Sequence, residues 1–108
     1  MHEYEVRRGQ YDNVKRDTLK GSMKNVFGNV DEKDGRFVSS FGAMKEVWAW
    51  PGEKGKSLCV ETKTDPTADN ETAQKTIKAY NTFLETVTGY NAKERGKRAQ
   101  KAAKEGKL

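Results

Sequence analysis

Apolar positions spaced three and four residues apart predict a long amphipathic helix over residues 73–87. Five apolar residues share this spacing and therefore one side of the helix: Ala73, Ile77, Tyr80, Leu84 and Val87. A short side-chain oxygen at Asp69 or Asn70 can cap its start, and Gly89 can end it in a left-handed conformation. A helix with such a pronounced apolar side needs an apolar surface to pack on.

A second helix is expected over residues 17–27, with Asp17 as its N-cap and Gly28 as its stop. Its apolar face holds four residues: Leu19, Met23, Val26 and Phe27. Around the opposite face lie four basic residues: Lys15, Arg16, Lys20 and Lys24. These bases can face phosphate, but a run of charge on a helix usually forms a solvated surface, and we favour that interpretation.

Alternation of apolar and polar residues predicts strands elsewhere in the chain. The predicted strands are residues 3–8, 36–41, 43–50 and 57–64, with reversals at 31–35 and 51–55. Short strands joined by short turns favour antiparallel pairing, since parallel neighbours need a long crossover. The sequence therefore predicts an α+β two-layer sandwich with helices on one face of an antiparallel sheet of four to five strands. The expected order is strand, helix, three strands, helix and then a tail.

Charge divides the chain into two parts. The first 88 residues hold 14 basic and 14 acidic residues, so the net charge of +5 lies in residues 89–108. We therefore predict one α+β domain over residues 1–89 and a basic C-terminal tail, helical in character, over residues 90–108. Deletion of residues 91–108 is expected to leave a cooperatively folded domain.

The tail offers the first candidate site. Asn91 and Glu94 have the spacing of a capping box, and small residues follow at positions 92, 96, 99 and 103. Six bases are candidate contacts to RNA or another polyanion: Lys93, Arg95, Lys97, Arg98, Lys101 and Lys104. The alternative is a tail that only makes the chain more soluble.

Two tryptophans offer the second candidate site. Alternation within residues 44–50 places Val47 and Ala49 on one face of a strand, and Met44, Glu46, Trp48 and Trp50 on the other. An unpaired glutamate is costly to bury, so the face with Glu46 is expected to point away from the helices. Trp48 and Trp50 there can stack on bases. Alternatively, the tail or a second copy of the chain covers them, or a bulge turns one ring inward. The competing function is a protein-interaction or self-association module that uses this face.

Catalytic chemistry has little support in the sequence. His2 is the single histidine, and Cys59 has no neighbour with which to form a metal site or a nucleophile pair. The Gly-Lys-Ser at residues 55–57 has Trp50 where a phosphate loop needs glycine, and it joins two predicted strands. We therefore expect a protein that is not an enzyme and has no cofactor or metal. One cysteine and no apolar run of about 18 residues indicate a cytoplasmic protein without a membrane span.

Four segments resemble a small family of uncharacterised archaeal proteins. They are residues 3–9 (EYEVRRG), 41–44 (FGAM), 80–85 (YNTFLE) and 88–95 (TGYNAKER), and the resemblance covers nearly the whole chain. It implies a two-layer sandwich related to the fold of the TATA-box-binding protein, with helices on one side of a curved antiparallel sheet. It implies no activity, cofactor or catalytic residue.

Overall fold

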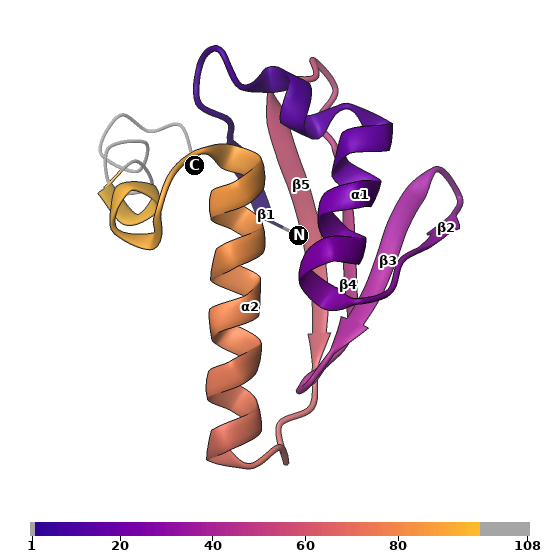
Figure 1. Cartoon of the computed structure of the whole chain (residues 1–108), viewed down its shortest axis with the longest axis vertical. Coiled ribbons are helices and arrows are strands. Elements are labelled where there is room, and N and C mark those ends of the chain that lie inside the picture. Colours follow the sequence, from indigo (N-terminus) through magenta and orange to yellow (C-terminus); the bar gives the residue numbers. More distant parts are fainter. Residues whose placement is uncertain (1, 98–108) are drawn as a thin grey trace.

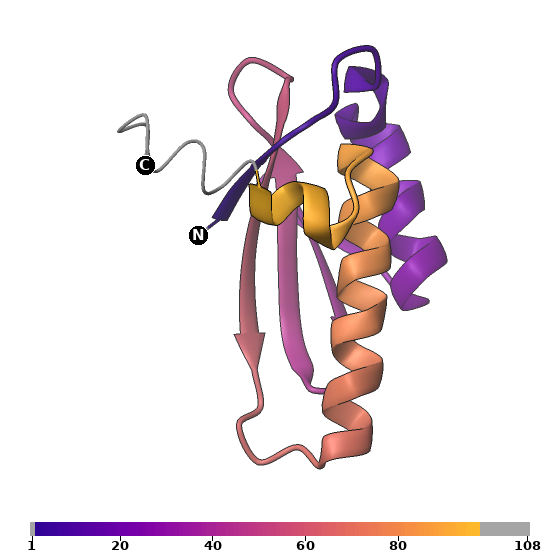
Figure 2. The same cartoon turned by 90° about the vertical axis from the view of Figure 1, so that its left-hand side faces the viewer.

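A five-stranded antiparallel sheet carries two long helices on one of its faces, as a computed structural model of the chain shows (Figure 1). The structure describes residues 2–97. The strands lie in the order β1-β5-β4-β3-β2, and every neighbouring pair is antiparallel. Figure 2 shows both helices on the same side of the sheet. The predicted α+β two-layer sandwich is therefore confirmed.

The elements are β1 (His2–Glu5), the 3-10 helix η1 (Tyr11–Val14), α1 (Arg16–Phe27), β2 (Asp31–Lys33), β3 (Arg36–Phe41), β4 (Met44–Pro51), β5 (Ser57–Thr64) and α2 (Asn70–Thr88). A short helix follows at residues 92–97. The chain has one strand more than the predicted order, because residues 31–33 pair with β3 instead of forming part of a turn. Asp34 and Gly35 both adopt positive φ, which is the geometry of the two-residue reversals that suit a twisted hairpin.

Helix α2 begins and ends as the sequence predicts. The Asp69 carboxylate accepts a hydrogen bond from the Thr72 backbone N–H at 2.7 Å, and Gly89 closes the helix in the left-handed region. Gly28 ends α1 in the same way. The predicted N-cap of α1 is wrong: Lys15 occupies that position without a side-chain cap, because η1 leads directly into the helix and places Asp17 inside its first turn.

The core lies between the helices and the sheet. Phe27 of α1 and Phe83 of α2 bring their ring centroids within 5.2 Å, and Val47 and Ala49 of β4 are fully buried beneath the helices. Met44 is also buried, although simple alternation places it on the opposite side with Glu46. The register of β4 and β5 shifts between Met44 and Glu46, and this irregularity turns the Met44 side chain towards the helices.

One residue of the predicted apolar stripe of α2 is exposed. Leu84 and Val87 are buried, but Ile77 remains 59% exposed. Strand β1 pairs only with residues 57–60 of β5, so the sheet is one strand narrower beneath the N-terminal half of α2. Figure 2 shows α2 continuing past the end of β1. Helical periodicity predicted which side of α2 faces the sheet, but it could not predict how far the sheet extends beneath the helix.

Candidate functional site

The two tryptophans lie on the side of the sheet away from the helices, which we call the open face. Val47 and Ala49 are fully buried under the helices, so Trp48 and Trp50 project from the other side, where both are half-buried. The Arg36 guanidinium lies over the Trp50 ring, 4.2 Å from its centroid. The Trp48 indole N–H donates to the Glu46 carboxylate at 3.2 Å. Both indoles are thus held by neighbours on the same face.

The open face carries more negative than positive charge. Residues paired across neighbouring strands share a face, so the strand register identifies its members. Five carboxylates belong to it (Glu3, Glu5, Asp31, Glu46 and Glu61), against three bases (Lys33, Arg36 and Lys63). Glu61 lies directly opposite Trp48, and Lys63 pairs with Glu46 at 3.3 Å. This charge balance disfavours phosphate beside the indoles.

Of the six tail bases named as candidates, three belong to the described short helix. Lys93 and Lys97 are exposed there. Arg95 is half-buried and already has partners, since its guanidinium donates to the Tyr90 carbonyl oxygen at 2.6 Å and to the Asn81 side-chain oxygen at 3.0 Å. Arg98, Lys101 and Lys104 lie outside the described residues.

The start of the predicted tail is attached to the rest of the chain. The expected capping box forms, because the Glu94 backbone N–H donates to the Asn91 side chain at 2.9 Å and the Asn91 N–H to the Glu94 carboxylate at 3.2 Å. Arg7 pairs with Glu94 at 3.0 Å, and Tyr90 is buried. These contacts hold the short helix against the rest of the chain. The division into a domain that ends at residue 89 and a separate tail stays a prediction.

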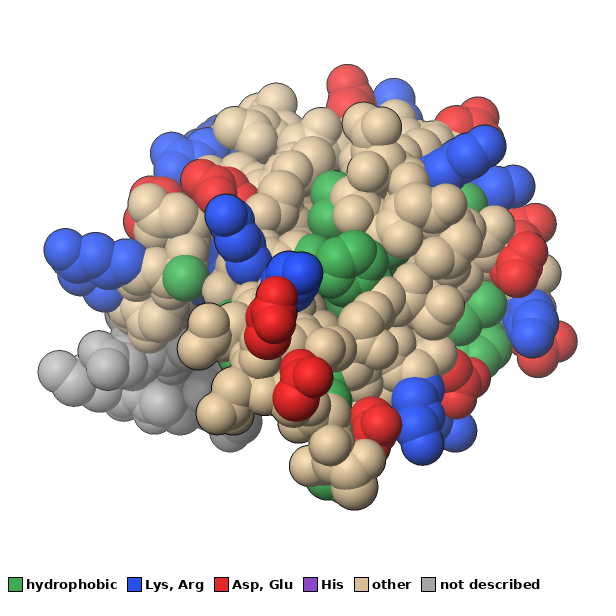
Figure 3. Space-filling view, turned by 60° about the horizontal axis from the view of Figure 1, so that its bottom comes forward, with side chains coloured by type: hydrophobic (Ala, Val, Ile, Leu, Met, Phe, Trp, Pro, Cys, Tyr) green, Lys and Arg blue, Asp and Glu red, His purple; other side chains and the backbone are tan. Residues whose placement is uncertain are grey.

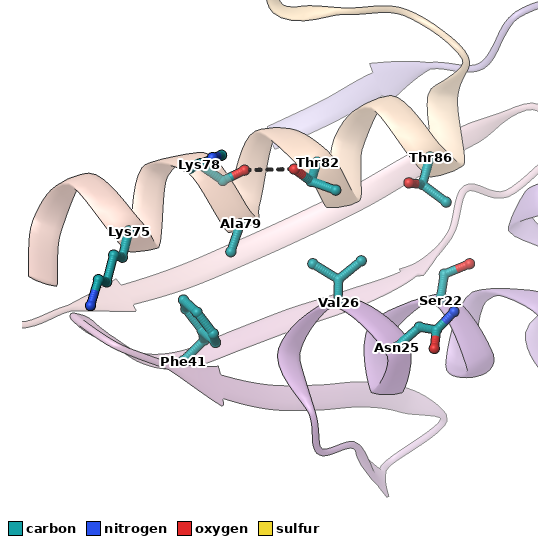
Figure 4. A pocket seen from close by; sticks show the side chains of 9 residues that line it. All are labelled: Ser22, Asn25, Val26, Phe41, Lys75, Lys78, Ala79, Thr82 and Thr86. Atoms are coloured by element: carbon teal, nitrogen blue, oxygen red, sulfur yellow. Dashed lines mark hydrogen bonds between the residues drawn. The ribbon is translucent and has the colours of Figure 1, made fainter.

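A groove between α1 and α2 is the feature that the sequence did not reveal. We call it the inter-helix groove; its volume is about 570 Å³. Val26 and Ala79 lie near its middle, Phe41 and Lys75 at one end, and Ser22, Asn25 and Thr86 at the other (Figure 4). Figure 3 shows an apolar patch set among charged side chains on the bottom of the molecule. The groove requires two helices whose residues are about 50 positions apart, so no local pattern could predict it.

Lys78 connects this groove to the short helix. Lys78 and Thr82 line the inter-helix groove, and they also line a second hollow of about 430 Å³ that Ala92 borders. The surface of α2 therefore runs from the groove, past Lys78, to the beginning of the basic segment. Within residues 2–97, Lys78, Lys93 and Lys97 form no ion pair.

The four bases expected on the first helix have different environments. Lys15 pairs with Asp12 at 3.0 Å. Arg16 pairs with Glu32 and lies over the Phe37 ring, so it links α1 to the sheet. Lys20 and Lys24 are exposed. Two of the four therefore have local structural partners, in keeping with a solvated charged face.

The described residues contain no evident catalytic group. Burial raises the pKa of the Cys59 thiol, and the nearby Glu3 carboxylate adds to this shift, so the reactive thiolate is disfavoured. Within residues 2–97, no three His, Cys, Asp or Glu side chains gather as metal ligands. No described helix is long and apolar enough to cross a membrane. The absence of an enzymatic activity, a cofactor and a metal stays a prediction.

Comparison with known proteins identifies relatives without a known role. A family model described as a domain of unknown function (DUF5611) matches residues 1–101. The NMR solution structure of the hypothetical protein TA0095 from Thermoplasma acidophilum is similar, with 28% identity and a TM-score of 0.69, over 92% of this chain and 97% of that one. No curated protein matches the chain. The expected relation to an uncharacterised archaeal family is thereby confirmed.

Proposed function

We propose that this chain, which belongs to the family of the domain of unknown function DUF5611, is a small module that binds polyanions such as RNA. The binding surface runs along the helix layer, from the inter-helix groove across Lys78 to the short helix. The family name records no activity, so the proposal depends on the geometry of this chain alone.

One observation carries the proposal: two exposed lysines of α2 line hollows that extend to the start of the short helix. Lys75 and Lys78 border the inter-helix groove, and Lys78 also borders the hollow beside Ala92, at the start of the segment with Lys93 and Lys97. The Glu71 carboxylate pairs with Lys75 at 3.4 Å, but both side chains are exposed, and an exposed ion pair is weak. Phosphates can therefore replace the carboxylate.

The groove suits a flexible polyanion better than a rigid duplex. Val26, Phe41 and Ala79 give it an apolar floor, against which a base or sugar can lie, while Ser22 and Thr82 add hydroxyl groups. Lysines are point charges that contact phosphate without reading base sequence. We therefore expect binding that depends on charge and single-stranded character and little on sequence.

The test uses the intact chain and a fluorescent oligouridylate. Its affinity should fall steeply between about 20 and 200 mM salt, because bound phosphates release counterions, with a log–log slope of about −0.7 per phosphate contacted. Replacing Lys75 and Lys78 together by Gln should make the slope shallower by up to about 1.4. Replacing Lys93 and Lys97 should have a similar effect.

A matched control removes two lysines elsewhere. Lys33→Gln with Lys54→Gln takes the same charge from exposed positions in β2 and the β4–β5 loop. This variant should bind oligouridylate nearly as well as the unaltered chain. Equal losses in the control and helix-layer variants would show that only net charge matters, and absence of binding at low salt would reject the proposal.

A second candidate function uses the open face for a protein contact. Trp48 and Trp50 lie half-buried in an acidic setting, a combination that suits a basic protein segment and not a nucleic acid. A second copy of the chain is one such partner. Trp48→Ala with Trp50→Ala should then dissociate a dimer measured by solution mass, whereas a chain that is monomeric at high concentration would contradict self-association.

Two expectations from the sequence, the relation to the TATA-box-binding protein and the cytoplasmic location, are not part of the evidence for binding. A relation to the TATA-box-binding protein is a likeness of fold, and fold alone does not transmit DNA binding. That relation and a cytoplasmic location both stay predictions.

A further inference from the structure

A hollow of about 350 Å³ lies between α2 and the sheet, where β1 no longer covers the edge of β5. Thr62 and Thr64 of β5 form one wall, and Ala73 and Ile77 of α2 the other. Ile77, 59% exposed, is the one large apolar side chain of the described residues that is so exposed. Such a volume falls within the range of small-molecule sites.

The lining of this hollow is mostly apolar, and His2 is the one nitrogen base among residues 2–97 that borders it. Met44, Pro66 and Ala73 contribute apolar surface, and no lysine or arginine borders it in the described part of the chain. Asp65 is the one carboxylate that does. Its Oδ1 accepts hydrogen bonds from the hydroxyl and the backbone N–H of Thr67, at 2.7 and 2.9 Å, and these bonds hold the pKa of Asp65 below its usual value. A neutral ligand therefore fits better than an anion.

A pair of tyrosine hydroxyls gives the hollow a hydrogen-bond donor. The Tyr4 and Tyr80 oxygens lie 3.2 Å apart, and both residues line the hollow. Each hydroxyl has one hydrogen, so the bond between them uses one and leaves the other to be donated. Burial, reinforced by the contact with Tyr4, raises the pKa of Tyr80, so the Tyr80 hydroxyl keeps its hydrogen. Among the described residues no further acceptor binds either hydroxyl.

We propose that this hollow binds a neutral, largely apolar small molecule whose single hydrogen-bond acceptor receives the free hydrogen of the Tyr4–Tyr80 pair. The apolar body of the molecule covers Ile77 and Ala73, and its acceptor points to the two hydroxyls. Ile77 borders both this hollow and the hollow beside Ala92, but no lysine or arginine lines the former, so the proposal concerns a different class of ligand and does not depend on polyanion binding.

The chain contains a built-in reporter for this test. Ile77 is the single isoleucine of the sequence, so isotope labelling of isoleucine δ1-methyl groups gives one NMR signal at the rim of the hollow. The probes are acetophenone, an aromatic ring with one carbonyl acceptor, and ethylbenzene, which lacks the oxygen. Acetophenone should shift the Ile77 signal saturably, and should bind roughly five- to tenfold more tightly than ethylbenzene.

Two variants test the contacts. Tyr4→Phe with Tyr80→Phe removes both hydroxyls without leaving a buried partner unsatisfied, so the fold is retained and the advantage of acetophenone should disappear. Ala73→Leu should fill the hollow and weaken both probes. Val30→Leu, in the loop between α1 and β2, is the control; Val30 does not line the hollow, so this change should leave both affinities unchanged.

Three results would overturn the proposal. The first is an Ile77 signal of the unaltered chain whose shift does not saturate, even at the highest concentration of acetophenone that dissolves. The double phenylalanine variant could retain the preference for acetophenone, which would exclude the hydroxyl pair as donor. A folded Ala73→Leu chain, verified by its melting transition, could bind both probes as before, which would exclude the hollow.

Discussion

At the scale of single residues, Thr76 shows how one hydroxyl joins the two layers. Its oxygen accepts a hydrogen bond from the Ala43 backbone N–H at 2.8 Å, and its hydrogen goes to the Thr72 carbonyl oxygen at 2.7 Å. Gly42, at φ 52°, precedes this contact, and a side chain there would collide with the Thr76 hydroxyl. The helix and the turn between β3 and β4 are therefore fixed to each other by a buried polar contact.

Thr76→Val should lower the free energy of unfolding by about 1–3 kcal/mol, because it keeps the shape of the side chain but leaves a buried N–H without an acceptor. Thr76→Ser, which retains the hydroxyl, should lose less. Urea denaturation of both variants measures the difference. Equal stability of Thr76→Val and the unaltered chain would mean that water satisfies the Ala43 N–H instead.

At the scale of elements, local signals predicted most of the fold. The Asp69 cap, the glycine stops at 28 and 89 and the periodicity of both helices are local features, and the structure confirms them. The burial of Met44 and the exposure of Ile77 were not predictable in this way. The burial of Met44 depends on the register shift between β4 and β5, and the exposure of Ile77 depends on how far β1 extends. Both therefore depend on a neighbouring strand.

The cap of α2 should give the protein a defined acid sensitivity. The hydrogen bond from the Thr72 backbone N–H holds the pKa of Asp69 below its ordinary value. The carboxylate therefore stabilises the fold at a pH above the unfolded-state pKa, and this contribution is lost as the pH falls through the folded-state pKa. Asp69→Asn keeps an acceptor that does not titrate.

The melting temperature of the Asp69→Asn chain should therefore fall less than that of the unaltered chain as the pH is lowered from about 6 to about 2. Asp65 remains in both proteins, so its own acid dependence cancels in the comparison. Parallel pH curves for the two proteins would show that the Asp69 charge does not contribute to helix stability.

At the scale of the whole molecule, the arrangement of charge matters more than its total. The sequence places the net charge of +5 in residues 89–108, and it offers no reason to connect those bases with Lys75 and Lys78. Folding places Lys75 and Lys78 on hollows that extend to Ala92, at the start of the described short helix. The same folding sets Trp48 and Trp50 on the acidic open face, so we expect a polyanion to bind the helix layer and not the indoles.

The most direct measurement is a two-dimensional ¹H–¹⁵N NMR titration of the intact chain with oligouridylate at low salt. The backbone signals of Lys75, Lys78, Thr82 and Ala92 report on the helix layer, and the two indole N–H signals of Trp48 and Trp50 report on the open face. Binding as proposed shifts the helix-layer signals and leaves both indole signals in place. Shifts of the indole signals with unmoved helix-layer signals, or no saturable shift at all, would contradict it.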